Sequence, residues 1–143
     1  MEHCRKFSAE EQSTEHPGFG YPSLIEQLRH IIGAEDYWFS VLQGNWDIED
    51  HAAACNTVAE LEERRGIVAN QTTDYLMNIT DQDLDKLDEY ATWPDATLRE
   101  LLPSMVIMRV ISHHIHHRGQ AVAICRILRN PAPTMDFPVA PPV

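Results

Sequence analysis

Histidines are the residues of this sequence whose number and spacing could support chemistry. The chain has eight histidines in 143 residues, and four of them fall within five positions, at His113, His114, His116 and His117. Histidines at positions i and i+4 of a helix lie on one face and can offer two nitrogen ligands to one metal ion. His113 and His117 have this spacing, and His113 and His116 form an i, i+3 pair. The spacing fits a divalent metal site or ordinary hydrogen-bonded histidines, and it does not choose between the two pairs.

A catalytic metal site usually has a third protein ligand and one open coordination position. His30 is the candidate for that ligand. A helical projection places Ala34, Tyr37 and Val41 on its side of the surrounding segment, so His30 should face inward from an apolar stripe. Two packed helices could then contribute one and two imidazoles to a shared centre. Such a set suits zinc or nickel, and also iron or cobalt.

The sequence lacks the motifs of several other kinds of catalytic site. The histidine cluster has no glutamate after its first histidine, so it is not the HExxH motif of a zinc protease, and no G-x-S-x-G, P-loop, G-x-G-x-x-G or CxxCH pattern occurs. Cys4, Cys55 and Cys125 are widely spaced, which argues against a disulfide framework or a thiolate zinc site. The nucleophile of any reaction is therefore expected to be a metal-bound species.

Three long helices are expected from their start and stop signals. Ser23 and Thr57 each precede a glutamate three positions later, which is the capping-box pattern of a helix start. The first helix should run from Ser23 to Gly44 and the second from Thr57 to about residue 79. The third should begin at Pro103, since proline is tolerated in a first turn, and should end before Asn130.

The third helix is apolar on nearly all sides, which predicts a central position in the domain. Residues 81–102 are expected to be mainly loop with some extended chain. Residues 1–12 should form only a short helix. Residues 131–143 contain five prolines, which favours an extended, proline-rich tail.

Length and charge limit the function classes. The chain is expected to form one domain over residues 1–143. It carries 22 acidic and 11 basic side chains, a formal net charge of −11, which would repel a phosphate backbone and argues against nucleic-acid binding. No stretch approaches the roughly 20 apolar residues of a membrane helix. A cytoplasmic protein without a membrane or nucleic-acid partner is therefore expected.

Two segments resemble the DinB/YfiT-like family of small metal-binding helical bundles. They are HHIHHRGQ, which begins at His113, and LRHIIGAEDYWFSVLQG, which contains His30. The resemblance implies an all-α four-helix bundle, and it implies that His30, His113 and His117 hold a divalent metal ion, which selects the i, i+4 pair. The first helix of such a bundle is shortened here. The apolar surface left uncovered predicts a homodimer.

The resemblance also implies a reaction. Some members of this family are metal-dependent transferases of low-molecular-weight thiols. The expected function is therefore a metal-dependent enzyme acting on a small-molecule substrate, as a transferase of small thiols or a hydrolase, with Gln120 and Tyr37 as candidate pocket residues. The alternative is a non-catalytic, dimeric bundle that binds a metal or a ligand.

Overall fold

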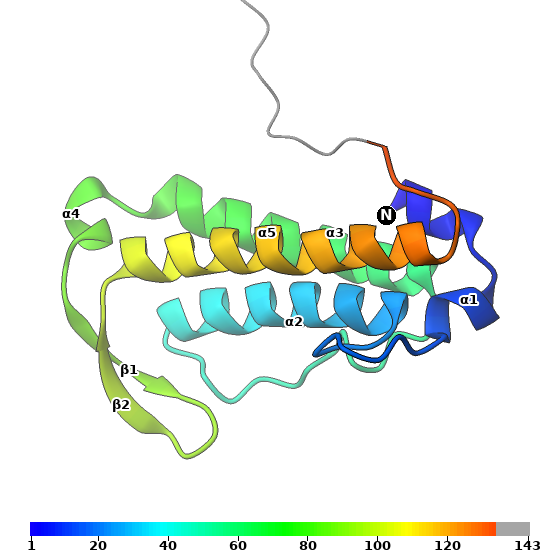
Figure 1. Cartoon of the computed structure of the whole chain (residues 1–143). Helices are drawn as coiled ribbons and strands as arrows, with labels where there is room; N and C mark the ends of the chain where they lie inside the picture. The colour runs from blue at the N-terminus through cyan, green and yellow to red at the C-terminus, as the bar shows by residue number, and fades with distance from the viewer. Residues whose placement is uncertain (134–143) are drawn as a thin grey trace, which may run out of the picture.

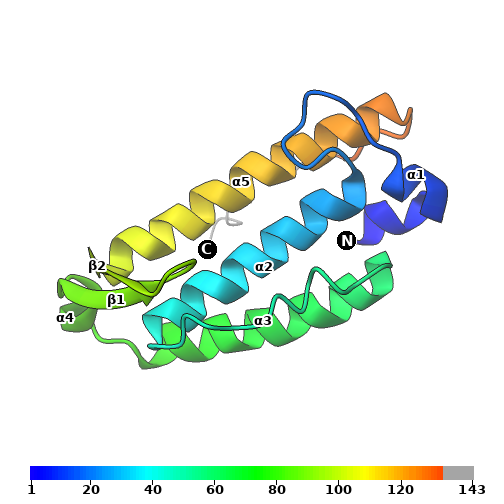
Figure 2. The same cartoon turned by 90° about the horizontal axis from the view of Figure 1, so that it is seen from below.

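Three long helices lie side by side in the computed structural model, which describes residues 1–133. They are α2 (Leu24–Leu42), α3 (Val58–Asn78) and α5 (Pro103–Ile127). Figure 2 shows α2 between the other two, and α2 accordingly contacts both of them. The expectation of a mostly helical chain with three long helices is confirmed.

Capping boxes start two of these helices, as their sequences predict. The Ser23 hydroxyl accepts a hydrogen bond from the backbone N–H of Glu26 at 3.3 Å, and the Glu26 carboxylate accepts one from the N–H of Ser23 at 3.0 Å. Thr57 and Glu60 make the same reciprocal pair at the start of α3. Each box satisfies backbone donors that a helix start leaves without partners. Gly44, just after the other end of α2, has a φ of +81°, a conformation that favours glycine and ends the helix. Residues close in sequence therefore determine both ends of α2.

α5 starts at Pro103 as expected and ends at Ile127. The prediction that this helix is central is wrong. Met108, Ile111 and Ile115 are 58%, 46% and 53% exposed, so one apolar side of α5 has no neighbour among the described residues. The sequence correctly shows apolar residues on this side of α5, but the N-terminal segment that could cover them is too short.

The N-terminal segment forms a short 3-10 helix η1 (Glu2–Lys6) and a single-turn helix α1 (Ala9–Ser13). Ser8 separates them and caps α1 through a reciprocal pair with Glu11. Figure 1 shows both helices at one end of the long helices, where Phe7 is buried against Leu24 and Ile124. The described residues thus contain three long helices and short N-terminal turns, so four full-length helices are not formed.

Residues 81–102 correct the all-α prediction. They form a short helix α4 (Asp81–Leu84) and two antiparallel strands, β1 (Asp88–Thr92) and β2 (Thr97–Leu101). The hairpin lies beside the ends of α2 and α5 (Figure 1), and the backbone N–H of Trp93 donates to the Tyr37 hydroxyl at 2.6 Å. Most strand residues are exposed, so the apolar alternation that identifies a half-buried strand is missing from the sequence.

The main core lies between α2 and α3. Ile25, Leu28 and Ile32 of α2 pack against Val58, Leu61 and Val68 of α3, with Ala52 of the connecting loop. Among residues 1–133, no helix combines the length and hydrophobicity needed to cross a bilayer. The predicted extended tail falls mostly on residues 134–143, which lie outside the described residues.

Candidate metal centre

Three histidine side chains converge between α2 and α5. His30 comes from α2, and His113 and His117 lie one turn apart on α5. Each offers a ring nitrogen, and these three atoms lie within 4.8 Å of one another. The Nε2 atoms of His30 and His113 are 2.8 Å apart. The structure therefore brings together the three residues that the sequence suggested as metal ligands.

Gln27 fixes the orientation of His117. The Gln27 side chain is fully buried one turn before His30, and its amide nitrogen donates to the backbone carbonyl of Tyr21 at 2.6 Å and to Oε1 of Gln120 at 2.8 Å. The amide oxygen must then be the acceptor in the 2.8 Å contact with Nδ1 of His117. His117 consequently carries its proton on Nδ1, and the lone pair of its Nε2 is available for a ligand.

Gln120 supports the centre indirectly. Its oxygen accepts from Gln27, and its amide nitrogen lies 2.6 Å from Nε2 of His116, to which it can donate. It therefore positions Gln27, and among the described residues its side chain makes no hydrogen bond to His117. His116 is outside the converging group, so the arrangement uses the i, i+4 pair of α5 and leaves the i, i+3 partner in a supporting contact.

His114 points to a different side of α5. Its Nε2 lies 3.4 Å from the carboxylate of Glu35, which also accepts a hydrogen bond from Thr72 at 2.7 Å. The approach to Glu35 is not a hydrogen bond, because His114 Nε2 is buried without a hydrogen-bond partner among the described residues. His114 is peripheral to the centre, as its projection on the helix indicates.

Two loop residues complete the surroundings of His30, and neither was identified from the sequence. The Tyr21 ring stacks on the His30 imidazole with centroids 3.8 Å apart and planes 18° apart. Asp50 passes so close to α2 that a Cβ on Gly33 would lie 2.9 Å from its Oδ1. Glycine inside a helix costs about 1 kcal/mol relative to alanine, and this close approach is a physical reason for it.

Burial keeps the three imidazoles neutral. Desolvation is the main cause that lowers the pKa of His30 to about 4, and the charge of His117 adds to it, whereas the negative charge of Asp50 acts in the opposite direction. Desolvation also lowers the pKa of His113 to about 4, with smaller contributions from His117 and His30. The pKa of His117 is lowered for the same first reason. Neutral imidazole is the form that binds a metal ion.

These side chains fit a divalent metal ion. The Nε2 atoms of His30 and His113 face each other at 2.8 Å, and His117 completes a group whose ring nitrogens converge within 4.8 Å. His117 has the outer hydrogen bond typical of metal-binding histidines, in which the second ring nitrogen donates to a fixed oxygen. Three protein ligands match a catalytic site with an open position.

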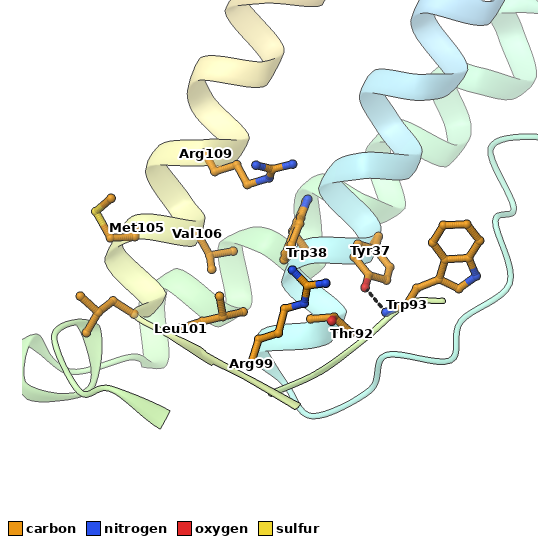
Figure 3. Close-up of a pocket in the computed structure, with 10 residues that line it drawn as sticks. Tyr37, Trp38, Thr92, Trp93, Arg99, Leu101, Met105, Val106 and Arg109 are labelled. Carbon is orange, nitrogen blue, oxygen red and sulfur yellow. Dashed lines mark hydrogen bonds between the residues drawn. The ribbon is translucent and has the colours of Figure 1, made fainter. Parts of the chain in front are cut away.

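A cavity of about 620 Å³ lies between α2, the start of α5 and the hairpin, and none of the three histidines lines it. Figure 3 shows Tyr37 and Trp38 of α2, Arg109 and Val106 of α5, and the hairpin residues that line it. Arg109 is one helical turn before His113, and Tyr37 is two turns after His30. Tyr37, which the sequence suggested as a pocket residue, therefore lines a cavity, and it also anchors the hairpin through Trp93.

Comparisons with known proteins agree with this architecture. An uncharacterized protein of Bacillus subtilis (strain 168), YizA, is 27% identical over 126 residues, which cover 88% of this chain and 77% of YizA. The crystal structure of a DinB-like protein from Bacillus cereus ATCC 10987 superposes with a TM-score of 0.73 at 20% identity, over 94% of this chain and 87% of that one, and so shares its fold. The model of the DinB family matches residues 1–141. The chain belongs to the DinB family.

Proposed function

We propose that this protein is a metal-dependent enzyme that transfers a small thiol to an electrophilic substrate. The observation that carries the proposal is the convergence of His30, His113 and His117, three neutral donors with one tautomer fixed by Gln27. A divalent ion at such a centre lowers the pKa of a thiol or a water molecule. We choose a thiol over water as the nucleophile because of the family resemblance. With water as the nucleophile, the same centre would act as a hydrolase.

The chain's own residues would have separate tasks in this reaction. His30, His113 and His117 hold the ion, and zinc or nickel suits them best, with iron or cobalt as alternatives. Tyr21 shields one face of His30 from solvent. Asp50 is the carboxylate that closely approaches α2 at Gly33, one turn after His30, so it is our candidate for accepting the proton that the thiol loses. The cavity beside Tyr37 would hold the electrophile.

The test uses protein purified without a histidine tag. We expect about one divalent ion per chain by elemental analysis, and metal-dependent consumption of 1-chloro-2,4-dinitrobenzene in the presence of cysteine or glutathione. His30→Ala should abolish turnover, whereas His114→Ala should retain most of it. Binding of metal without turnover above that of the free ion, over a panel of thiols and electrophiles, would favour the non-catalytic binding bundle. Absence of metal after reconstitution would contradict the metal-dependent enzyme and the metal-binding bundle alike.

The uncovered side of α5 supports a second proposal, a homodimer. Its exposed residues Ile111 and Ile115 border a cavity of about 410 Å³ that is lined largely by apolar side chains of η1, α2 and α5. Apolar surface of this kind is typically covered by a partner. We propose that a second copy of the chain covers it.

Light scattering over a dilution series tests the dimer. We expect a dimer at micromolar concentration and a shift toward monomer in Ile115→Glu, since a buried, unpaired charge at the interface is strongly unfavourable. Leu98→Glu, at an exposed apolar position of β2 that does not line this cavity, is the matched control and should remain dimeric. A monomer of the natural chain at every concentration would contradict this proposal.

A further inference from the structure

The cavity of about 620 Å³ differs in charge from the rest of the molecule. The chain has a net charge of −11, yet two arginines, Arg99 of β2 and Arg109 of α5, line this cavity, and none of the described residues lining it is acidic. Figure 3 shows both guanidinium groups turned toward Trp38. Positive charge is thus concentrated in a hollow on an otherwise acidic protein.

These two arginines are available for a ligand. Arg5 and Arg64 each form an ion pair with a carboxylate, whereas Arg99 and Arg109 have no such partner up to Pro133. Asp95, at the turn of the hairpin, has its pKa lowered first by hydrogen bonds from Thr97 and last by the charge of Arg99, but it forms no ion pair with Arg99 in the described residues and does not line the cavity. The Arg109 guanidinium lies 5.0 Å from the centroid of the Trp38 ring, which holds it in place without neutralising it.

Aromatic side chains form much of the remaining wall. Tyr37 and Trp38 face the cavity from α2, and Trp93 borders it from the hairpin, where it is 69% exposed. An exposed tryptophan at a cavity edge leaves a large planar surface without a partner in the described part of the chain. The wall therefore suits a flat, apolar group next to an oxyanion.

We propose that this cavity binds a small organic anion, with its carboxylate held by Arg99 and Arg109 and its planar apolar body packed against Trp38 and Tyr37. His113 follows Arg109 by one helical turn, since four residues at about 1.5 Å each separate the two positions by about 6 Å along α5. A carboxylate bound at Arg109 would thus lie close to the helical turn that carries His113. Its role as the substrate rests on the function proposed above, whereas its binding does not.

Calorimetric titration of the metal-free protein tests the binding. The probes are naphthalene-1-acetate, its neutral primary amide, and 1-naphthyl phosphate. We expect the carboxylate to bind at least about 10-fold more tightly than the amide, because hydrogen bonds to a charged group contribute about 1.5–3 kcal/mol. Arg99→Gln and Arg109→Gln should each reduce carboxylate affinity by roughly 10-fold and leave the amide unchanged. Arg126→Gln is the control for general electrostatic attraction and should have no effect.

Several outcomes would overturn the assignment. Equal affinity for acid and amide, or an equal loss in Arg126→Gln, would mean that the two arginines do not recognise the anion. Preference for the phosphate over the carboxylate would replace the proposed ligand class. If the metal-loaded protein turns over an electrophilic aromatic acid, KM should rise in Arg99→Gln while kcat changes little. An unchanged KM would overturn the substrate role alone, and absence of metal or turnover would leave the binding result intact.

Discussion

His113→Ala should lower the affinity for Zn²⁺ or Ni²⁺ by more than about 100-fold. Loss of an outer hydrogen-bond partner typically costs 10- to 100-fold in metal affinity, and removal of a ligand should exceed that range. The His113 ring lies with its Nε2 atom 2.8 Å from that of His30, so its loss leaves two donors where three converge. Competition with a chromophoric chelator at neutral pH measures the change.

Two further variants test whether the loss of metal affinity is specific to the three proposed ligands. Gln27→Ala removes the acceptor that orients His117 and should fall in the range of about 10- to 100-fold. His114→Ala, next to His113 in sequence but close to Glu35, should bind metal almost as the natural chain does. A loss in His114→Ala as large as that in His113→Ala would mean that the cluster binds metal nonspecifically, and the assignment of three ligands would be wrong.

The metal-free protein should lose stability as the pH falls from about 6.5 to about 4. Burial holds the pKa of His30 and His113 at about 4, whereas the ordinary pKa of histidine in an unfolded chain is about 6.5. Between these values the unfolded chain binds more protons than the folded one. Acid therefore favours unfolding, and stability is fully present above about pH 6.5 and declines toward pH 4.

Thermal unfolding at several pH values measures this effect. The melting temperature of the metal-free chain should decrease through the window, and it should change less in the double variant His30→Gln, His113→Gln, which has no imidazole to protonate at these positions. Carboxylates such as Asp83, whose pKa is lowered by hydrogen bonds from Thr80, act at lower pH in both proteins and cancel in the comparison. A pH profile identical in the two proteins would contradict burial of neutral imidazoles.

Local signals made much of the fold predictable. Ser23 and Thr57 start their helices through contacts within four residues, and Pro103 does so through its own ring, so no knowledge of the tertiary structure is needed. The hairpin lacks such a signal, because charged and exposed residues dominate both strands and its position depends on the contact between Trp93 and Tyr37.

The same distinction applies to the candidate site. The histidines were found because a helix fixes which residues share a face, and Gln27 could have been found in the same way, since it precedes His30 by one turn on an apolar face. Tyr21 and Asp50 could not, because they lie in loops whose paths are determined by the packing of the helices that they connect.

The two parts of the molecule around the candidate site are built from different kinds of structure. All three imidazoles come from long helices whose packing also forms the core, whereas Trp93 and Arg99 come from a short hairpin that contributes little to that core. Substitutions in the hairpin can therefore accumulate at small cost to folding. The lining of the cavity can in this way change while the three histidines and the packing that places them stay the same.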